Sequence, residues 1–156
     1  RRAREEASRE QRAACTIMLR LVLDTNVVLD LFHWGNVDAV PIMDALEGGR
    51  IECLADQLTL DELQRVLTYP QLKLTPEMAV DRYQHYSRLV QLVGEGEAPP
   101  LPRCQDRDDQ KFLELAARCG ADLLVSKDKA LLKLRGRTKL AFQILKPAQA
   151  SALIAT

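Results

Sequence analysis

Short apolar runs alternate with helix-patterned segments along most of the chain. The clearest run, Leu19–Leu23, is rich in branched side chains and ends at Asp24, as is typical of a strand buried on both faces. Thr25 and Asn26 interrupt the apolar pattern, and three apolar residues then follow at helical spacing. The pattern predicts a strand that turns directly into a helix, with Thr25 or Asn26 as the helix cap.

The rest of the chain repeats this alternation of short apolar runs and segments with a helical period. Strands that alternate with helices form parallel sheets, so we expect an α/β fold with a central, mostly parallel sheet and helices on both faces. Further strands are predicted at residues 51–55, 122–126 and 140–145, helices at residues 37–46, 56–67, 75–93, 106–119, 130–134 and from 147 onward, and loops at residues 33–36 and 94–102.

Length and composition indicate one ordinary globular domain. The chain has 156 residues, of which 47% are hydrophobic and 28% charged, values typical of a single domain with its own core. Residues 1–17 are rich in Arg and Glu and lack an apolar stripe, so we interpret them as a charged extension. The domain itself is then expected over residues 18–156, beginning at Met18.

Several functional classes receive little support. No apolar stretch approaches the roughly 18 residues of a membrane span, and the first residues lack the apolar region of a signal peptide. The spacing of the four cysteines does not suit a zinc site, and free thiols without an export signal indicate the cytosol. A net charge of zero argues weakly against a pure nucleic-acid-binding protein.

Acidic residues recur where the predicted strands end or the helices begin. Asp24 ends the first strand, and Asp128 lies two residues after the end of the strand predicted at residues 122–126. Asp108 and Asp109 lie at a helix start, and Glu62 borders the apolar stripe of another helix. Each residue alone fits a cap, a turn or a solvated face. In a parallel sheet, however, these positions converge at the carboxyl edge, where α/β folds bind ligands.

Carboxylates grouped without histidine or cysteine favour hard divalent cations, Mg²⁺ or Mn²⁺. Close carboxylates repel one another, by about 4 kcal/mol per pair at a separation of ~4 Å near a protein surface, and a cation removes that repulsion. One or two such ions can activate water and stabilise an in-line displacement at phosphorus. The acidic pattern therefore favours phosphodiester hydrolysis.

A basic run follows the last of these acids. Such a run suits the binding of a polyanion backbone, although a solvated charged face is the commoner origin of such runs. Its cations, which surround the single acid Asp128, are Lys127, Lys129, Lys133, Arg135, Arg137 and Lys139. We expect the first five to contribute to binding of a polyanion such as a nucleic acid.

Three segments, in this order, resemble a PIN domain of the VapC-like branch: LVLDTNVVLDLF, DELQRVL and DRDDQKFLELAARCGADLLVSKDKALL. This branch includes the toxin components of bacterial toxin–antitoxin pairs. The resemblance implies a Rossmann-like three-layer sandwich, Mg²⁺ or Mn²⁺ as cofactor and endoribonuclease activity. It also implies a homodimer or higher homo-oligomer and, for a toxin, an antitoxin protein that blocks the site.

The resemblance also assigns roles to individual residues. The four acids that it makes catalytic residues and metal ligands are Asp24, Glu62, Asp109 and Asp128, with Asp108 as the alternative or additional third ligand. The polar positions expected to support them are Thr25, Asn26 and Ser126, whereas Asp106 is interpreted as a turn residue or a support for the ligands.

Two positions depart from the family pattern. Lys127 stands where a small residue often precedes the fourth acid, so its cation could contact phosphate or weaken metal binding. Gln110 replaces an acid often seen in this branch, which removes one potential ligand.

Two other functions remain open from the sequence. A phosphoaspartyl enzyme with Asp24 as nucleophile is disfavoured because a second Asp two residues later is replaced by Asn26. A catalytically silent PIN-like module that binds RNA or protein is the main alternative. For His33 and Trp34, packing or a dimer contact is favoured over base stacking.

Overall fold

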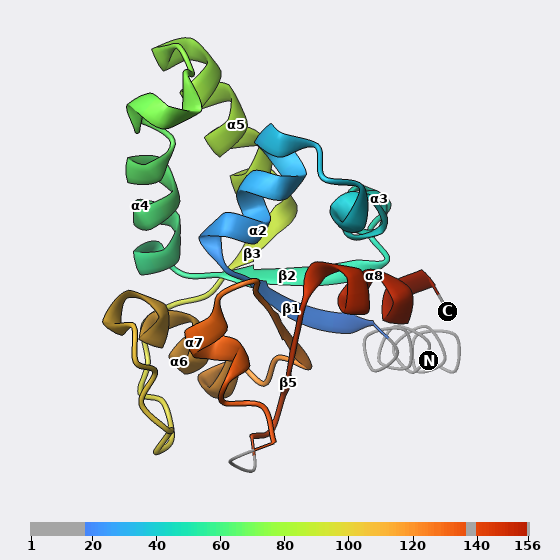
Figure 1. Cartoon of the computed structure of the whole chain (residues 1–156), viewed down its shortest axis with the longest axis vertical. Helices are drawn as coiled ribbons and strands as arrows, with labels where there is room; N and C mark the ends of the chain where they lie inside the picture. Colours follow the sequence, from blue (N-terminus) through green and yellow to red (C-terminus); the bar gives the residue numbers. More distant parts are fainter. Residues whose placement is uncertain (1–17, 137–139, 156) are drawn as a thin grey trace, which may run out of the picture.

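The computed structural model describes residues 18–136 and 140–155. They form three layers, a five-stranded sheet with helices on each of its faces (Figure 1). The strand order is β3-β2-β1-β4-β5, and every pairing is parallel. The predicted α/β fold with a parallel sheet is therefore confirmed. The segment 1–17, which we interpreted as an extension, lies outside the described residues.

The first strand occupies the centre of the sheet. Its register pairs Leu21 with Cys53 on one side and with Leu123 on the other, so both edges of β1 are hydrogen-bonded. This placement explains why the segment is almost uniformly apolar. The strands are β1 (Leu19–Leu23), β2 (Ile51–Ala55), β3 (Val90–Leu92), β4 (Leu123–Val125) and β5 (Gln143–Leu145).

Seven α-helices cover the two faces of the sheet in the described part of the chain. They are α2 (Thr25–Leu29), α3 (Val40–Glu47), α4 (Gln57–Val66), α5 (Pro76–Leu89), α6 (Gln110–Arg118), α7 (Lys129–Leu132) and α8 (Pro147–Ala155). Shorter turns of helix lie at Asp30–Trp34, which is a π-helix, and at the 3₁₀ segments Val37–Ala39, Pro70–Leu72 and Arg107–Asp109.

Alternate residues of β1 enter two different apolar cores. Leu21 and Leu23 pack with α2, α3, α4, α5 and α8, whereas Val22 packs with Phe112 and the rest of α6 and with Leu131 of α7. Figure 1 shows α6 and α7 on one side of the sheet and the other helices on the opposite side. No helix among the described residues is both long and apolar enough to span a membrane.

Most predicted boundaries agree with the structure, and the side chains of Asp56 and Thr75 cap the helices that were predicted to begin at these residues. The cap of α2 was predicted wrongly: Asp24 fills this position, and its side chain accepts a hydrogen bond from the Val27 amide. An Asp that directly follows a strand already has the extended conformation that an N-cap requires.

Two further predictions are corrected by the structure. The helix expected to reach residue 93 ends at Leu89, and Val90–Leu92 forms the edge strand β3 instead. The loop expected from His33 begins later, because the π-helix Asp30–Trp34 extends α2 up to Gly35. Gly35 ends this turn with φ of 59°, a left-handed conformation that glycine adopts without strain.

Candidate functional site

The carboxyl ends of the two central strands bring Asp24 and Asp128 to the same edge of the sheet. Asp24 directly follows β1, is only 3% exposed and accepts hydrogen bonds from the Val27 amide at 2.9 Å and from the Ser126 hydroxyl. Ser126 directly follows β4 and in turn accepts a hydrogen bond from the Asp128 amide at 2.9 Å. A fully buried serine thus connects the two acids.

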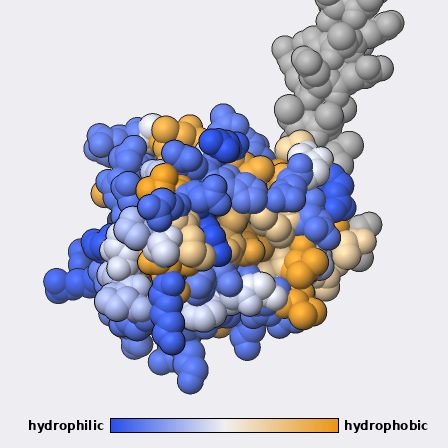
Figure 2. All heavy atoms as spheres, turned by 90° about the horizontal axis from the view of Figure 1, so that it is seen from above, coloured by the Kyte–Doolittle hydropathy of each residue, from blue (hydrophilic) through white to orange (hydrophobic). Residues whose placement is uncertain are grey.

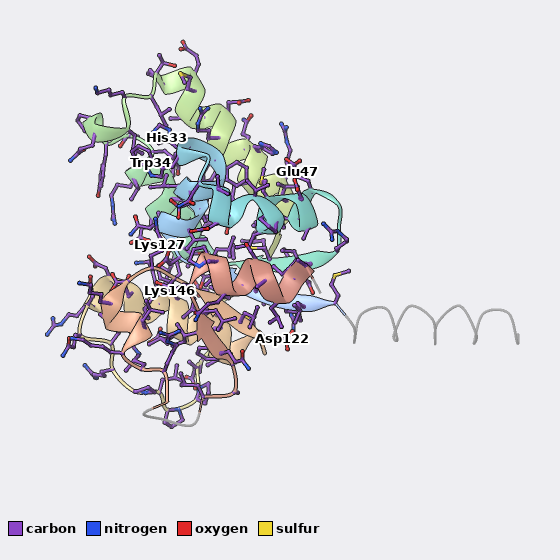
Figure 3. The ribbon with its side chains drawn as sticks, turned by 45° about the vertical axis from the view of Figure 1, so that its right-hand side comes forward. His33, Trp34, Glu47, Asp122, Lys127 and Lys146 are labelled. Atoms are coloured by element: carbon purple, nitrogen blue, oxygen red, sulfur yellow. The ribbon has the colours of Figure 1, made fainter. Side chains whose placement is uncertain are left out.

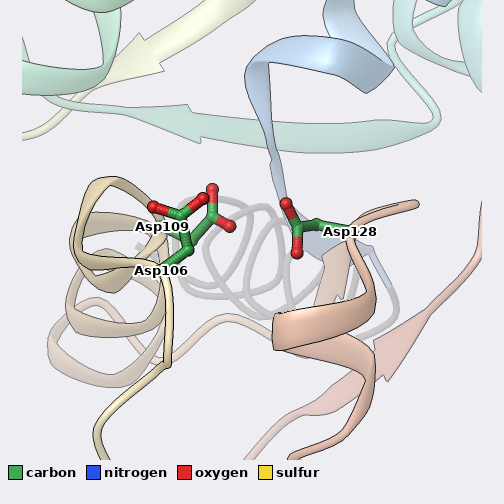
Figure 4. Close-up of side chains that lie close together, drawn as sticks. All are labelled: Asp106, Asp109 and Asp128. Atoms are coloured by element: carbon green, nitrogen blue, oxygen red, sulfur yellow. The ribbon is translucent and has the colours of Figure 1, made fainter.

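Three carboxylates lie close enough to share one cation. Asp106, Asp109 and Asp128 each offer an oxygen within 4.8 Å of the others. Figure 4 shows Asp106 and Asp109, from the turn that leads into α6, facing Asp128 at the start of α7. One oxygen of Asp109 is shielded from water and finds no hydrogen-bond donor among the described residues. Such an orphaned acceptor is uncommon unless a ligand satisfies it.

The electrostatics of this edge favour protonated carboxyls. Burial raises the pKa of Asp24 from 3.8 to about 6, against the lowering effect of its hydrogen bonds from Ser126 and Val27. Burial also raises the pKa of Asp109 to about 8, helped by a hydrogen bond with Asp128 and by the charges of Asp128, Asp106 and Asp24. Concentrated negative charge of this kind is relieved by protons or by a cation.

Glu62 lies beside the three-carboxylate group but outside it. The Thr25 hydroxyl donates to one oxygen of Glu62, and the Lys111 ammonium lies 2.8 Å from the other. Both oxygens therefore have partners already. Thr25 therefore contacts Glu62, whereas Asn26 is exposed beside it.

The third acid was ambiguous in the sequence. Asp109 is the member of the three-carboxylate group, whereas Asp108 is exposed and donates its amide to Asp106 at 3.0 Å. Asp106 is the turn residue that we expected, because its side chain caps the 3₁₀ turn. We expected it at most to support the ligands, whereas the structure places it among the three grouped carboxylates.

An unexpected ion pair borders the site. Asp30, in the π-helix, is 2% exposed, and its two oxygens lie 2.9 and 2.8 Å from the Lys127 ammonium. Figure 3 shows Lys127 between the segment that carries His33 and Trp34 and the end of β5, where Lys146 lies. The sequence analysis singled out Lys127 but not Asp30, because an Asp within a predicted helix is usually solvated.

Gln110, the second departure from the family pattern, does not face the acids. Its side chain accepts a hydrogen bond from the Cys104 amide at 2.7 Å and donates to the Pro102 carbonyl at 3.3 Å. The amide thereby fastens the loop before α6, and an acid at this position could make only the first of these contacts.

The basic run leads away from this edge. Lys129, Lys133 and Arg135 are exposed, and Arg135 donates to the Gln149 side chain at 3.1 Å. Arg137 and Lys139 lie outside the described residues. The surface also exposes the apolar residues Trp34, Val37 and Val40, by 57%, 80% and 46%. Figure 2 shows that apolar and hydrophilic side chains both reach the surface on one face of the molecule.

The three-carboxylate group fits a hard divalent cation. Its donors are carboxylate oxygens without nitrogen or sulfur, as Mg²⁺ and Mn²⁺ prefer. The unpartnered oxygen of Asp109 and the raised pKa of this carboxyl both indicate that the protein itself does not stabilise its ionised form.

Comparison with known proteins identifies the family. A family model described as PIN domain matches residues 20–130, so the chain belongs to the PIN domain family. PIN domains are generally nucleases that use divalent metal ions. A comparison with curated proteins gives no match.

Two solved structures share the fold. VapBC2 from Rickettsia felis, bound to a DNA fragment from its promoter, matches with a TM-score of 0.57 and 11% identity over 82% of this chain and 98% of the other. PAE2754 from Pyrobaculum aerophilum matches with a TM-score of 0.56 and 15% identity over 88% of this chain and 90% of the other.

Proposed function

We propose that this chain is a metal-dependent endoribonuclease of the VapC-like branch that hydrolyses phosphodiester bonds in RNA. The observation that carries the proposal is the convergence of Asp106, Asp109 and Asp128 at the carboxyl edge of a parallel sheet. Membership of the PIN domain family supports hydrolysis of nucleic acid as the activity.

Asp106, Asp109 and Asp128 would hold Mg²⁺ or Mn²⁺. When bound, such an ion would neutralise these carboxylates and act as a Lewis acid toward a phosphate oxygen. Asp24 is retained as a catalytic residue, because its charge acts on both Asp109 and Asp128 and it directly follows the central strand. Its hydrogen bond from Ser126 also fixes the backbone at Asp128.

Cations along one side of the acids would hold the RNA backbone. Lys127 is fixed by Asp30 and yet keeps 44% of its side chain exposed, so its ammonium can also donate to a phosphate oxygen. Lys129, Lys133 and Arg135 extend this positive surface, and Arg137 continues it in sequence. Contacts of this kind bind the backbone irrespective of base sequence.

A protein partner is part of the proposal. The similar fold of VapBC2, a complex that its description places on promoter DNA, supports a toxin role with a small antitoxin as partner. The exposed residues Trp34, Val37 and Val40 form a group of apolar side chains close in sequence that could bind such a partner or a second copy in a homodimer.

Cleavage of a mixed RNA pool tests the activity. We expect the wild-type chain to cut RNA at internal positions in Mn²⁺, to stop in excess chelator, and to resume when Mn²⁺ is restored. Asp128→Asn should lose at least about a hundredfold in rate while remaining folded. A folded chain that binds RNA but leaves it intact under all these conditions would be the catalytically silent module instead.

A further inference from the structure

Lys111, at the start of α6, forms an ion pair with Glu62. Its ammonium lies 2.8 Å from Glu62, and the two side chains are only 19% and 13% exposed. The same ammonium donates to the Asp108 carbonyl and lies 5.2 Å from the centre of the Phe112 ring. A carboxylate, a carbonyl and an aromatic face therefore surround one cation, an arrangement that holds it in place.

Both oxygens of Glu62 already have hydrogen-bond partners, and one of these partners is a cation. The Thr25 hydroxyl donates to Oε2, and Lys111 occupies Oε1. An ammonium group has no lone pair with which to bind a metal, and its positive charge repels a nearby divalent ion. Because both partners are largely shielded from water, solvent screens this repulsion less than at the surface.

We propose that Lys111 occupies the place at Glu62 that a second divalent ion would otherwise take. The inference rests on the proposed function, in which Asp106, Asp109 and Asp128 hold a divalent ion. It departs from the expectation that Glu62 is a metal ligand. The chain then binds one divalent ion beside one built-in ammonium, where two-metal hydrolases bind two ions. Lys111 is accordingly a positioning residue that acts through Glu62.

Calorimetric titration of the full chain with Mn²⁺ in the absence of RNA measures the number of ions bound per chain. We expect one ion per chain for the wild type. Glu62→Gln should also bind one ion, with a dissociation constant within about threefold of the wild-type value. Lys111→Met keeps the length of the side chain but removes its charge, so a second, weaker ion should bind.

Two further variants make the result specific. Glu62→Gln combined with Lys111→Met should return the stoichiometry to one, because the second ion needs the Glu62 carboxylate. Lys73→Met removes an exposed lysine in the turn before α5 and should leave the stoichiometry at one. Thermal melting of each variant in chelator gives its folded fraction, and the number of bound ions is expressed per folded chain.

Two results would overturn the role of Lys111. One is a wild-type chain that binds two ions and loses one in Glu62→Gln. The other is a folded Lys111→Met chain that still binds a single ion, because the pair would then be only a structural bridge between α4 and α6. Failure of the proposed function has a different signature: Asp128→Asn would bind Mn²⁺ as the wild type does, or no variant would bind it.

Discussion

At the scale of single residues, the site is defined by carboxyl groups whose pKa is raised in the folded chain. Asp24 is buried against Ser126 and Val27, and Asp109 faces the other acids. Burial raises the pKa of both, to about 6 and about 8. Near neutral pH the metal-free site therefore holds a proton, chiefly on Asp109, that a divalent cation would displace.

These pKa shifts predict how the stability of the metal-free chain depends on pH. Each carboxyl has a usual pKa of 3.8 and a higher one in the folded chain, so between these values the folded state binds more protons than the unfolded state. The stabilisation is fully present below about pH 4 and is lost as the pH rises through about 6 and then about 8. Denaturant unfolding in chelator measures it.

The control for this pH dependence is the double variant Asp24→Asn and Asp109→Asn, which lacks both titrating groups. The difference in unfolding free energy, parent minus variant, should fall steadily from about pH 4 to about pH 8. A difference that stays level or rises over this range would contradict the shifts.

Asp24→Asn separates a catalytic role from a structural one. The amide keeps an oxygen for the Val27 amide and can still bond to Ser126, but removes a buried charge. We expect RNA hydrolysis to fall by orders of magnitude, while the metal-free melting temperature above about pH 6 stays level or rises. A variant that is destabilised but cleaves in proportion to its folded fraction would show that Asp24 is only a turn residue.

Sequence pattern predicted some of the site residues and not others. Asp24, Asp109 and Asp128 each adjoin a strand or helix boundary that the apolar pattern shows, so their convergence followed from a parallel sheet. Asp106 also stands at a predicted helix start, but we interpreted it as a turn residue or a support for the ligands. Asp30 carries no such signal, because a carboxylate on a helix is usually solvated. Their approach to Asp128 and Lys127 depends on how α6 and the π-helix pack.

At the scale of elements, predicted and observed structure agree best where the apolar residues recur most regularly. The buried central strands and the capped helices α4 and α5 were predicted closely. The edge strand β3 was missed because Val90 and Val93 continue the helical spacing of α5, while the two remaining strand residues are exposed. Only its pairing with β2 makes this segment a strand.

The pair between Lys127 and Asp30 joins two such elements, the loop after β4 and the π-helix. Lys127→Met leaves the Asp30 carboxylate buried without its partner. Since Lys127 itself is partly exposed, we expect a loss of about 2 kcal/mol in unfolding free energy, below the usual range for a fully buried pair. Denaturant unfolding at neutral pH measures this loss.

Two further variants test whether that loss of unfolding free energy comes from the ion pair. Lys129→Met, at an exposed lysine two residues away, should change the unfolding free energy by less than about 0.5 kcal/mol. Adding Asp30→Asn to Lys127→Met should recover part of the stability, because the buried charge is removed. Equal effects of the two lysine variants would mean that the pair does not stabilise the junction.

At the scale of the whole molecule, charge is separated although it sums to zero. The carboxylates gather at one edge of the sheet, and the basic run begins beside them and leads away along the surface. Such an arrangement can hold a polyanion while a cation neutralises the acids. The zero net charge was thus a weak argument against nucleic-acid binding.

The basic run predicts salt-sensitive RNA binding. Replacing Lys133, Arg135 and Arg137 together by Ala should weaken binding across RNA sequences. It should also reduce the slope of log affinity against log salt by about 2, since each phosphate contact on a single strand contributes about 0.7. Filter binding in chelator, in which RNA should stay uncut, gives the slope.

A triple variant with the same change in charge controls for net charge alone. Arg65, Lys73 and Arg88 are exposed and belong to the α4–α5 region rather than to the basic run. Their replacement by Ala should leave the slope close to that of the parent. If the two triple variants behave alike, the basic run is only a solvated face.

The stabilisation of the chain by Mn²⁺ tests the central claim, that the three carboxylates hold a divalent ion. At about 100 times the dissociation constant, Mn²⁺ should raise the melting temperature of the parent by roughly 5–10 °C. Asp108→Asn should show the same rise, because Asp108 lies outside the group, whereas Asp109→Asn should lose most of it. Equal rises in the parent and in Asp109→Asn would contradict the account.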